Sequence, residues 1–154
     1  MPADDVKGSP QPPPADDTKG SPRTPPPADE VQPFAYAVLR VVPRVERGER
    51  LNVGVALFCR RHDFLDLRAR LDLARLAALA PDLDPAPVQS RLDALALVFR
   101  GNPAGGALAA LDPSDRFGWL VAPSSTIIQP SRVHTGMTAD PRATLNRLFD
   151  ALVA

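Results

Sequence analysis

The feature that most constrains the fold is one segment, Leu51–Cys59, which is apolar at almost every position. A half-exposed strand would alternate apolar and polar residues, so a continuous apolar run indicates a strand in the interior of a sheet. Asn52 is its one polar amide, and Gly54 is expected to mark a bulge or a close backbone approach. The rest of the chain must therefore supply neighbouring strands on both sides of this segment.

Two further strands flank it in the sequence. Phe34–Val42 alternates and is rich in β-branched and aromatic residues, and Pro43 ends it because proline donates no ladder hydrogen bond. Phe64–Arg70 has a clear period of two. Short loops connect the three segments, which favours an antiparallel meander.

The pattern then changes to the period of a helix. Leu71–Ala80 predicts a short helix that ends before Pro81. A longer one begins at Asp84-Pro85 and ends before Gly101, and a last one begins at Asp140-Pro141. The faces expected to be buried are Val88, Leu92, Leu95 and Phe99 in the longer helix, and Leu145, Leu148, Phe149 and Leu152 in the last.

Between the longer helix and the last one, two more strands are predicted, Phe117–Ala122 and Ser125–Gln129, joined by Pro123–Ser124. The predicted order is βββ-α-α-ββ-α. Because the helices cluster and do not alternate with the strands, the expected fold class is α+β. The prediction is an antiparallel sheet of about five strands packed with helices.

The first 33 residues have a different composition. They hold ten of the 19 prolines, and PADDVKGSPQPP (Pro2–Pro13) recurs as PADDTKGSPRTPP (Pro14–Pro26). Such a segment has almost no apolar side chains to bury and cannot offset the entropy of ordering. We expect a disordered, Pro- and Asp-rich tail over residues 1–33, followed by one α+β domain over residues 34–154.

Charge and motifs exclude several classes of protein. The formal net charge is zero; the tail is mildly acidic, and residues 34–154 are mildly basic with arginine as their only base. A nucleic-acid partner is therefore disfavoured but not excluded. The GxxxxGK[ST], GxGxxG, HExxH and GxSxG motifs are absent. With one cysteine and two histidines, we expect no disulfide, no metal site and no cofactor.

Location follows from two further absences. No apolar run approaches the roughly 20 residues that span a membrane, so no membrane association is expected. The N-terminus lacks the basic and then apolar pattern of a signal peptide, which makes the cytoplasm the expected location.

Two polar clusters are candidates for function. The first surrounds the first hairpin and is either a solvated charged turn or a loop that contacts an anion or a partner. The second lies within Pro123–Gly136, where the hydroxyls either cap turns or recognise a ligand; a Ser–His catalytic pair is a weaker alternative. If the late strands join the early ones, both clusters could form one binding surface without covalent catalysis. The candidate binding residues are Arg40, Arg44, Arg47, Glu49, Asn52, Ser125, Gln129 and His134.

Two segments carry a resemblance to a known family. YAVLRVVPRVERGERLNVGVALF (Tyr36–Phe58) resembles the opening of a bacterial family of domains of unknown function, which runs Y-x-V-[IL]-R-x-V-P and then R-G-E-x-x-N-V-G-V. RFGWLVAPSSTIIQPSRVHTGMTADP (Arg116–Pro141) resembles its F-x-W-L, S-S-x-x-I-Q-x-S and H-x-G segments. Pro123 replaces an arginine of the family pattern. The resemblance covers residues 36–153.

What the resemblance implies is an association and not a mechanism. Members of the family are often encoded near a kinase similar to the persistence-toxin Ser/Thr kinases, which implies a protein partner. The leading interpretation is therefore a small cytoplasmic interaction or regulatory domain, accessory to such a kinase. The alternative is an enzyme, or a subunit of one, that acts on a phosphate-bearing or nucleic-acid substrate.

Overall fold

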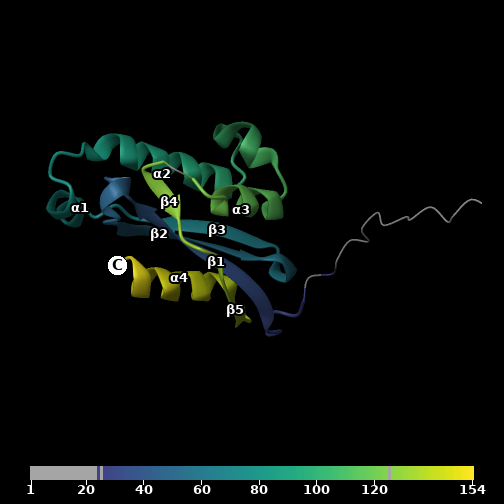
Figure 1. The fold of residues 1–154 in the computed structure, drawn as a ribbon. Coiled ribbons are helices and arrows are strands. Elements are labelled where there is room, and N and C mark those ends of the chain that lie inside the picture. Colours follow the sequence, from purple (N-terminus) through teal and green to yellow (C-terminus); the bar gives the residue numbers. More distant parts are fainter. Residues whose placement is uncertain (1–23, 25, 125) are drawn as a thin grey trace, which may run out of the picture.

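The computed structural model of the protein describes residues 24, 26–124 and 126–154. In this part of the chain, one antiparallel sheet lies between two helical layers (Figure 1). The strands are β1 Gln32–Val41, β2 Leu51–Cys59, β3 Phe64–Ala69, β4 Ile128–Pro130 and β5 His134–Thr138. The α-helices are α1 Leu73–Leu79, α2 Pro85–Phe99, α3 Pro113–Val121 and α4 Pro141–Leu152; the short 3-10 helices are η1 Val45–Arg47, η2 Arg60–His62 and η3 Pro103–Ala110.

The predicted α+β class with a five-stranded antiparallel sheet is confirmed. The sheet has the order β3-β2-β1, and the other edge of β1 is shared by β4 and β5. Strand β2 is therefore interior, as its apolar sequence predicts, and the first three strands form the expected meander. The expected disorder of the tail concerns mainly residues 1–23 and 25, which lie outside the described residues. Strand β1 begins at Gln32, slightly earlier than expected.

The helical layers cover opposite faces of this sheet. Helices α1, α2 and α3 pack on one face, and α4 packs on the other, mainly against β2 and β3 (Figure 1). The expected helix caps form: Asp84 accepts a hydrogen bond from the backbone N–H of Ala86, and Asp140 accepts one from that of Ala143. The predicted faces are buried or half-buried in both long helices. Each helical layer thus closes its own apolar core.

A bulge at Val53 interrupts the pairing of β2 with β1. Leu39 of β1 pairs with Gly54, whereas the next residue, Arg40, pairs with Asn52. Val53 therefore has no register partner on β1. An extra residue of this kind bends and twists the strand locally.

The bulge also reverses which face of the sheet each side chain occupies. Before it, Leu51 and Val53 belong to the core under α1, α2 and α3. After it, Val55, Leu57 and Cys59 belong to the core under α4. A strand alternates its side chains with a period of two, so one inserted residue exchanges the two faces. The single bulge lets one apolar segment supply both cores.

Gly54 lies directly after the bulge in a space too small for a side chain. A Cβ atom there would lie 3.1 Å from the Cβ of Ala69 and 3.1 Å from the backbone oxygen of Arg68 on β3. This is the close backbone approach that the sequence predicts.

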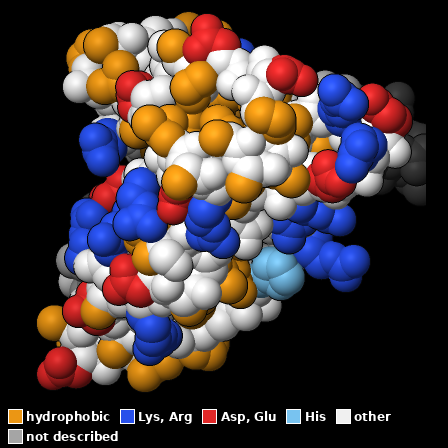
Figure 2. Space-filling model, turned by 90° about the vertical axis from the view of Figure 1, so that its left-hand side faces the viewer, with side chains coloured by type: hydrophobic (Ala, Val, Ile, Leu, Met, Phe, Trp, Pro, Cys, Tyr) orange, Lys and Arg blue, Asp and Glu red, His pale blue; other side chains and the backbone are white. Residues whose placement is uncertain are grey.

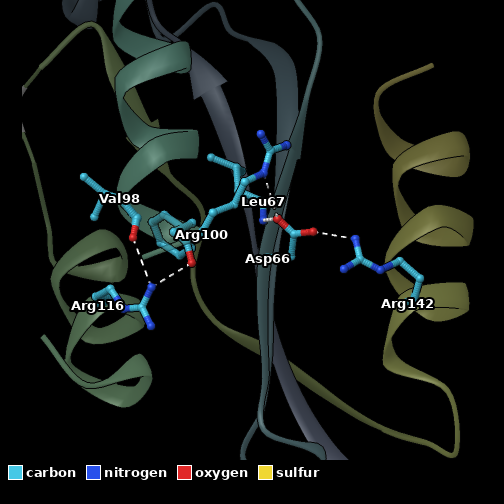
Figure 3. A network of polar contacts seen from close by, with 7 residues as sticks. Asp66, Leu67, Val98, Arg100, Arg116 and Arg142 are labelled. Carbon is cyan, nitrogen blue, oxygen red and sulfur yellow. Dashed lines mark hydrogen bonds and ion pairs between the residues drawn. The ribbon is translucent and has the colours of Figure 1, made fainter. Parts of the chain in front are cut away.

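The strand predicted over residues 117–122 is wrong, because this segment lies in helix α3. Pro113 opens that helix in its first turn, and Phe117 and Leu120, one turn apart, are buried. Arg116 Nη1 donates to the backbone oxygens of Val98 (3.1 Å) and Phe99 (2.9 Å) at the end of α2 (Figure 3). These tertiary contacts override the β-type composition of the segment.

The second late strand is also displaced from its predicted position. In that region Ile128–Pro130 forms β4, which overlaps the predicted strand by two residues, and β5 follows at His134–Thr138, where the sequence predicted no strand. Gly136 in the middle of β5 interrupts the pattern of side chains by which a strand is predicted from sequence. It faces Phe34 across the strand pair, and a Cβ there would lie 2.7 Å from the Phe34 ring. The aromatic ring covers the glycine and fills the space that a side chain would take.

Asp66 on the edge strand β3 links the two helical layers (Figure 3). Its carboxylate accepts a hydrogen bond from Arg142 of α4 at 2.5 Å, and Arg100, at the end of α2, lies 3.7 Å away. The same carboxylate accepts the backbone N–H of Leu67. The Asp66 side chain is only 13% exposed, so its charge needs these partners.

Replacing Gly54 by valine should lower the free energy of unfolding by about 1–3 kcal/mol, the usual cost of overpacking a core. The measurement is a urea denaturation curve. Gly118→Ala is the matched control, because Gly118 has open space around it within α3 and the exchange should stabilise the helix slightly. A neutral Gly54→Val would contradict the close packing of β2 on β3.

Asp66→Ala should destabilise the domain by about 1–3 kcal/mol, because it leaves a backbone N–H and two arginines without their shared acceptor. Asp150→Ala is the control: its contact with Arg68 is 3.8 Å long and exposed, so we expect a change within about 0.5 kcal/mol. Equal urea midpoints for the two variants would show that Asp66 does not connect the layers.

Candidate functional site

Three of the predicted site residues form one row across the sheet. Arg40 on β1 pairs with Asn52 on β2 and, on its other side, with Gln129 on β4. Residues that are directly opposite in an antiparallel sheet place their side chains on the same face. The expectation that the strand carrying Gln129 lies beside an early strand is therefore confirmed.

This row lies on the face that α4 covers, at the C-terminal end of that helix. Asn52 Nδ2 donates to the backbone oxygen of Leu152 at 3.0 Å. The last carbonyls of a helix lack partners within the helix, so this bond satisfies one of them. Part of the function of Asn52 is therefore to fix the end of α4 on the sheet.

Arg40 has a more unusual environment. Its Nε atom is buried and has no hydrogen-bond partner within the described residues. Burial, and then the positive charge of Arg50, lower the pKa of the Arg40 guanidinium below its ordinary value. Within the part of the chain that the structure describes, no carboxylate forms an ion pair with either arginine. Within the described residues, these two neighbouring cations therefore have no ion-pair partner.

His134 of β5 lies on the same face of the sheet, beside an earlier residue of β1. It pairs with Tyr36, and the two rings stack with centroids 5.1 Å apart and 26° between their planes. Tyr36 and Arg40 are four residues apart on one strand, so they share a face and lie about 13 Å from each other. We call Tyr36, Arg40, Gln129 and His134 the open strip; all four are half-buried, because α4 packs mainly on β2 and β3.

Figure 2 shows the end of the molecule where α4 terminates. Arginine side chains form a band across the middle of this end, with a histidine at its margin. Arginine side chains are therefore prominent at this end of the molecule, with acidic side chains among them, although the formal net charge of the chain is zero.

A separate cleft, away from the open strip, contains three predicted residues of the hairpin, Arg44, Arg47 and Glu49. With Pro43 and residues 79–83 they line this cleft, which has a volume of about 390 Å³ and lies between the β1–β2 loop and the end of α1. Arg47 and Glu49 form an ion pair at 2.5 Å, which raises the pKa of Arg47 and lowers that of Glu49. Three of the predicted residues thus line this cleft, whereas Arg40, Gln129 and His134 belong to the open strip and Asn52 lies beside Arg40 in the row.

The hydroxyls of the second cluster mostly satisfy the backbone. Ser131 accepts the N–H of Val38 at 2.9 Å and donates to the oxygen of Arg132 at 2.7 Å. Thr126 donates to the oxygen of Ile128. These contacts fit the turn-capping interpretation of the cluster. Ser125, the remaining predicted site residue, lies outside the described residues.

The candidate binding residues leave out three residues, although one of them, Arg50, belongs to the first polar cluster of the sequence. Arg50 and Tyr36 become relevant only through their neighbours, Arg40 and His134. Trp119 lies on the opposite face of the sheet and lines a second cleft, of about 230 Å³. The signal that could have identified it is its uniqueness, because it is the one tryptophan of the chain.

Asn52→Ala should lower the free energy of unfolding by about 1 kcal/mol, the usual net value of one hydrogen bond, and leave the domain folded. Gln129→Ala, in the same row and without a hydrogen bond recorded for its side chain in the described residues, should change stability by less than about 0.5 kcal/mol. Urea denaturation followed by circular dichroism measures both. If Asn52→Ala is as stable as the parent, the amide does not hold α4.

The described part of the chain holds no group of three or more His, Cys, Asp or Glu side chains placed to bind a metal ion. Among its helices, none is both long enough and apolar enough to cross a membrane. These two findings concern the described residues alone.

Comparison with known proteins gives a family. No curated protein and no solved structure matches the chain. One family model, described as "Protein of unknown function (DUF3037)", matches residues 36–153, the same span over which the sequence resembles a domain of unknown function. The match covers both motif segments and every strand and helix from Tyr36 to the end of α4. The chain therefore belongs to the DUF3037 family of proteins of unknown function.

Proposed function

We propose that this domain binds an acidic segment of a partner protein on the open strip and the adjacent Arg50, with Arg40 and Arg50 as the main anion contacts. The single observation that carries the proposal is the environment of Arg40. Its guanidinium is half-buried, its Nε atom has no partner in the described residues, and its neighbour Arg50 has the same charge.

An arrangement of this kind has an energetic cost in the free protein. A partly desolvated cation beside another cation is destabilising, and a carboxylate or a phosphate between the two guanidiniums would offset that cost. Arginine presents its donors in a planar fork that matches either anion. The free protein thus holds a local charge imbalance that binding would relieve.

The shape of the surface favours a protein over a small molecule. The open strip lies on a sheet face, and its residues do not line the clefts that Arg44 and Trp119 line. Gln129 adds an amide to this surface, and the stacked rings of Tyr36 and His134 add a flat aromatic area. Arginine and aromatic side chains are enriched in protein interfaces.

The partner that we propose is a Ser/Thr kinase in the cytoplasm, with the domain as its accessory or regulatory subunit. This step rests on the resemblance in the sequence and not on the geometry. The alternative is an enzyme, or a subunit of one, that acts on a phosphate-bearing substrate, because the same two guanidiniums would hold a phosphate.

Arg40→Gln should weaken partner binding about tenfold or more, because a charged hydrogen bond contributes about 1.5–3 kcal/mol. The partner is recovered by affinity purification from the native host with the full-length chain. Its dissociation constant is then measured by titration calorimetry at two salt concentrations, and the variant should also show a smaller salt dependence. Arg61→Gln is the control, since Arg61 is exposed in η2, at the other end of β2.

The proposal is wrong if folded Arg40→Gln and Arg50→Gln variants bind the partner like the parent. Turnover of a phosphate ester by the purified chain, lost in Arg40→Gln, would instead favour the enzyme alternative. Circular dichroism of each variant separates loss of binding from loss of fold.

A further inference from the structure

The cleft that contains Trp119, which we call the Trp119 cleft, lies on the face of the sheet opposite the open strip. Its volume is about 230 Å³. Four residues of the apolar core line it, and the Trp119 side chain, in a residue that is 41% exposed, forms part of its rim. These four core residues are Leu39, Leu95, Leu120 and Ile128. The cleft thus lies over buried residues of the core, beside a large exposed aromatic ring.

The polar groups around the cleft are already paired, with one exception. The hydroxyls of Ser124 and Thr126 hydrogen-bond each other at 2.9 Å, and Thr126 also donates to the oxygen of Ile128 at 2.6 Å. Arg91 of α2 is the one charged residue in the lining. Within the described residues, it has neither an ion pair nor a side-chain hydrogen bond.

We propose that the Trp119 cleft binds one large apolar side chain of a partner peptide, with an adjacent acidic residue held by Arg91. The cleft is on the scale of a single side chain and smaller than the roughly 300–1,000 Å³ of typical ligand pockets. Tryptophan is enriched among the residues that contribute most of the binding energy at protein interfaces. The positive charge of Arg91 selects a carboxylate next to the buried side chain.

The chain's own N-terminal segment is a poorer occupant. It carries acidic residues, but the side chains of residues 1–23 include only Met1 and Val6 as apolar groups larger than alanine or proline. The inference treats the ligand as part of a protein, as the proposed function does. It shares no residue with the open strip, so each can fail without the other.

The experiment uses the full-length chain and its intrinsic fluorescence. Because Trp119 is the one tryptophan, its emission reports directly on the cleft. The probes are acetyl-Gly-Leu-Asp-Gly-amide, a version with Asn in place of Asp, and a version with Ala in place of Leu. The first should give a saturable blue shift at millimolar concentration.

The two changed peptides measure the two parts of the proposal. The Asn peptide should bind about two- to fivefold more weakly, which is the range for an exposed charge pair. The Ala peptide should bind about tenfold more weakly or worse, because most of the apolar burial is lost. Arg91→Gln should abolish the preference for Asp over Asn. Arg147→Gln, an exposed arginine on α4, should retain it.

Several results would overturn the proposal. They are the absence of any saturable change in emission, equal affinity for the Leu and Ala peptides, and a preference for Asp that persists in Arg91→Gln. A loss of the response in Arg40→Gln would place the peptide on the open strip. Nuclear magnetic resonance shifts of residues 1–23 during the titration would mean that the peptide displaces the chain's own N-terminal segment.

Discussion

Strand β2 is buried on both faces, and the position of every other element follows from this burial. Val53 and Ala56 contribute to one core and Val55 and Leu57 to the other, and all four are inaccessible to solvent. A strand without a solvent-facing side needs a strand at each edge and a covering layer on each face. Strands β1 and β3 supply the edges, α1, α2 and α3 cover one face, and α4 covers the other (Figure 1). Asp66 then joins the two layers around the edge of β3.

The bulge at Val53 also determines the candidate site. If β2 had no bulge and Val55 kept its place under α4, strict alternation would put Val53 on the same face as Val55 and Asn52 on the opposite face. Asn52 would then lie under the larger helical layer, where a buried amide would need a hydrogen-bond partner. The extra residue places Asn52 on the face of α4, where it bonds the end of that helix. It also brings Asn52 into line with Arg40. One local irregularity thus supplies both apolar cores and forms the polar row.

The two candidate binding regions share strands β1 and β4 but lie on opposite faces. Leu39 lines the Trp119 cleft, and the next residue, Arg40, belongs to the open strip. Ile128 and Gln129 have the same relation on β4. This follows from the period of two in a strand, which sends neighbouring side chains in opposite directions. The edge of the sheet at β4 is therefore the region where apolar and cationic surfaces come closest together.

By itself, the sequence determined the elements whose signals are local. Continuous apolar character identified β2 as interior, and Asp–Pro pairs located the starts of α2 and α4. These features depend on side-chain periodicity, helix capping and backbone sterics, which act over a few residues. The hypothesis of one shared surface stays a prediction; the strand pairing places Asn52 and Gln129 beside Arg40, and His134 beside Tyr36.

Only the tertiary structure decided the rest. Phe117–Val121 is helical because Arg116 and the apolar face of α3 pack against α2, although its composition favours a strand. Strand β5 forms by pairing with the distant strand β1, where Phe34 covers Gly136. The separation of Arg44, Arg47 and Glu49 from the open strip depends on where the β1–β2 loop meets the end of α1. These outcomes depend on contacts between distant segments, and the free energy of such packing exceeds the small local preferences of the residues involved.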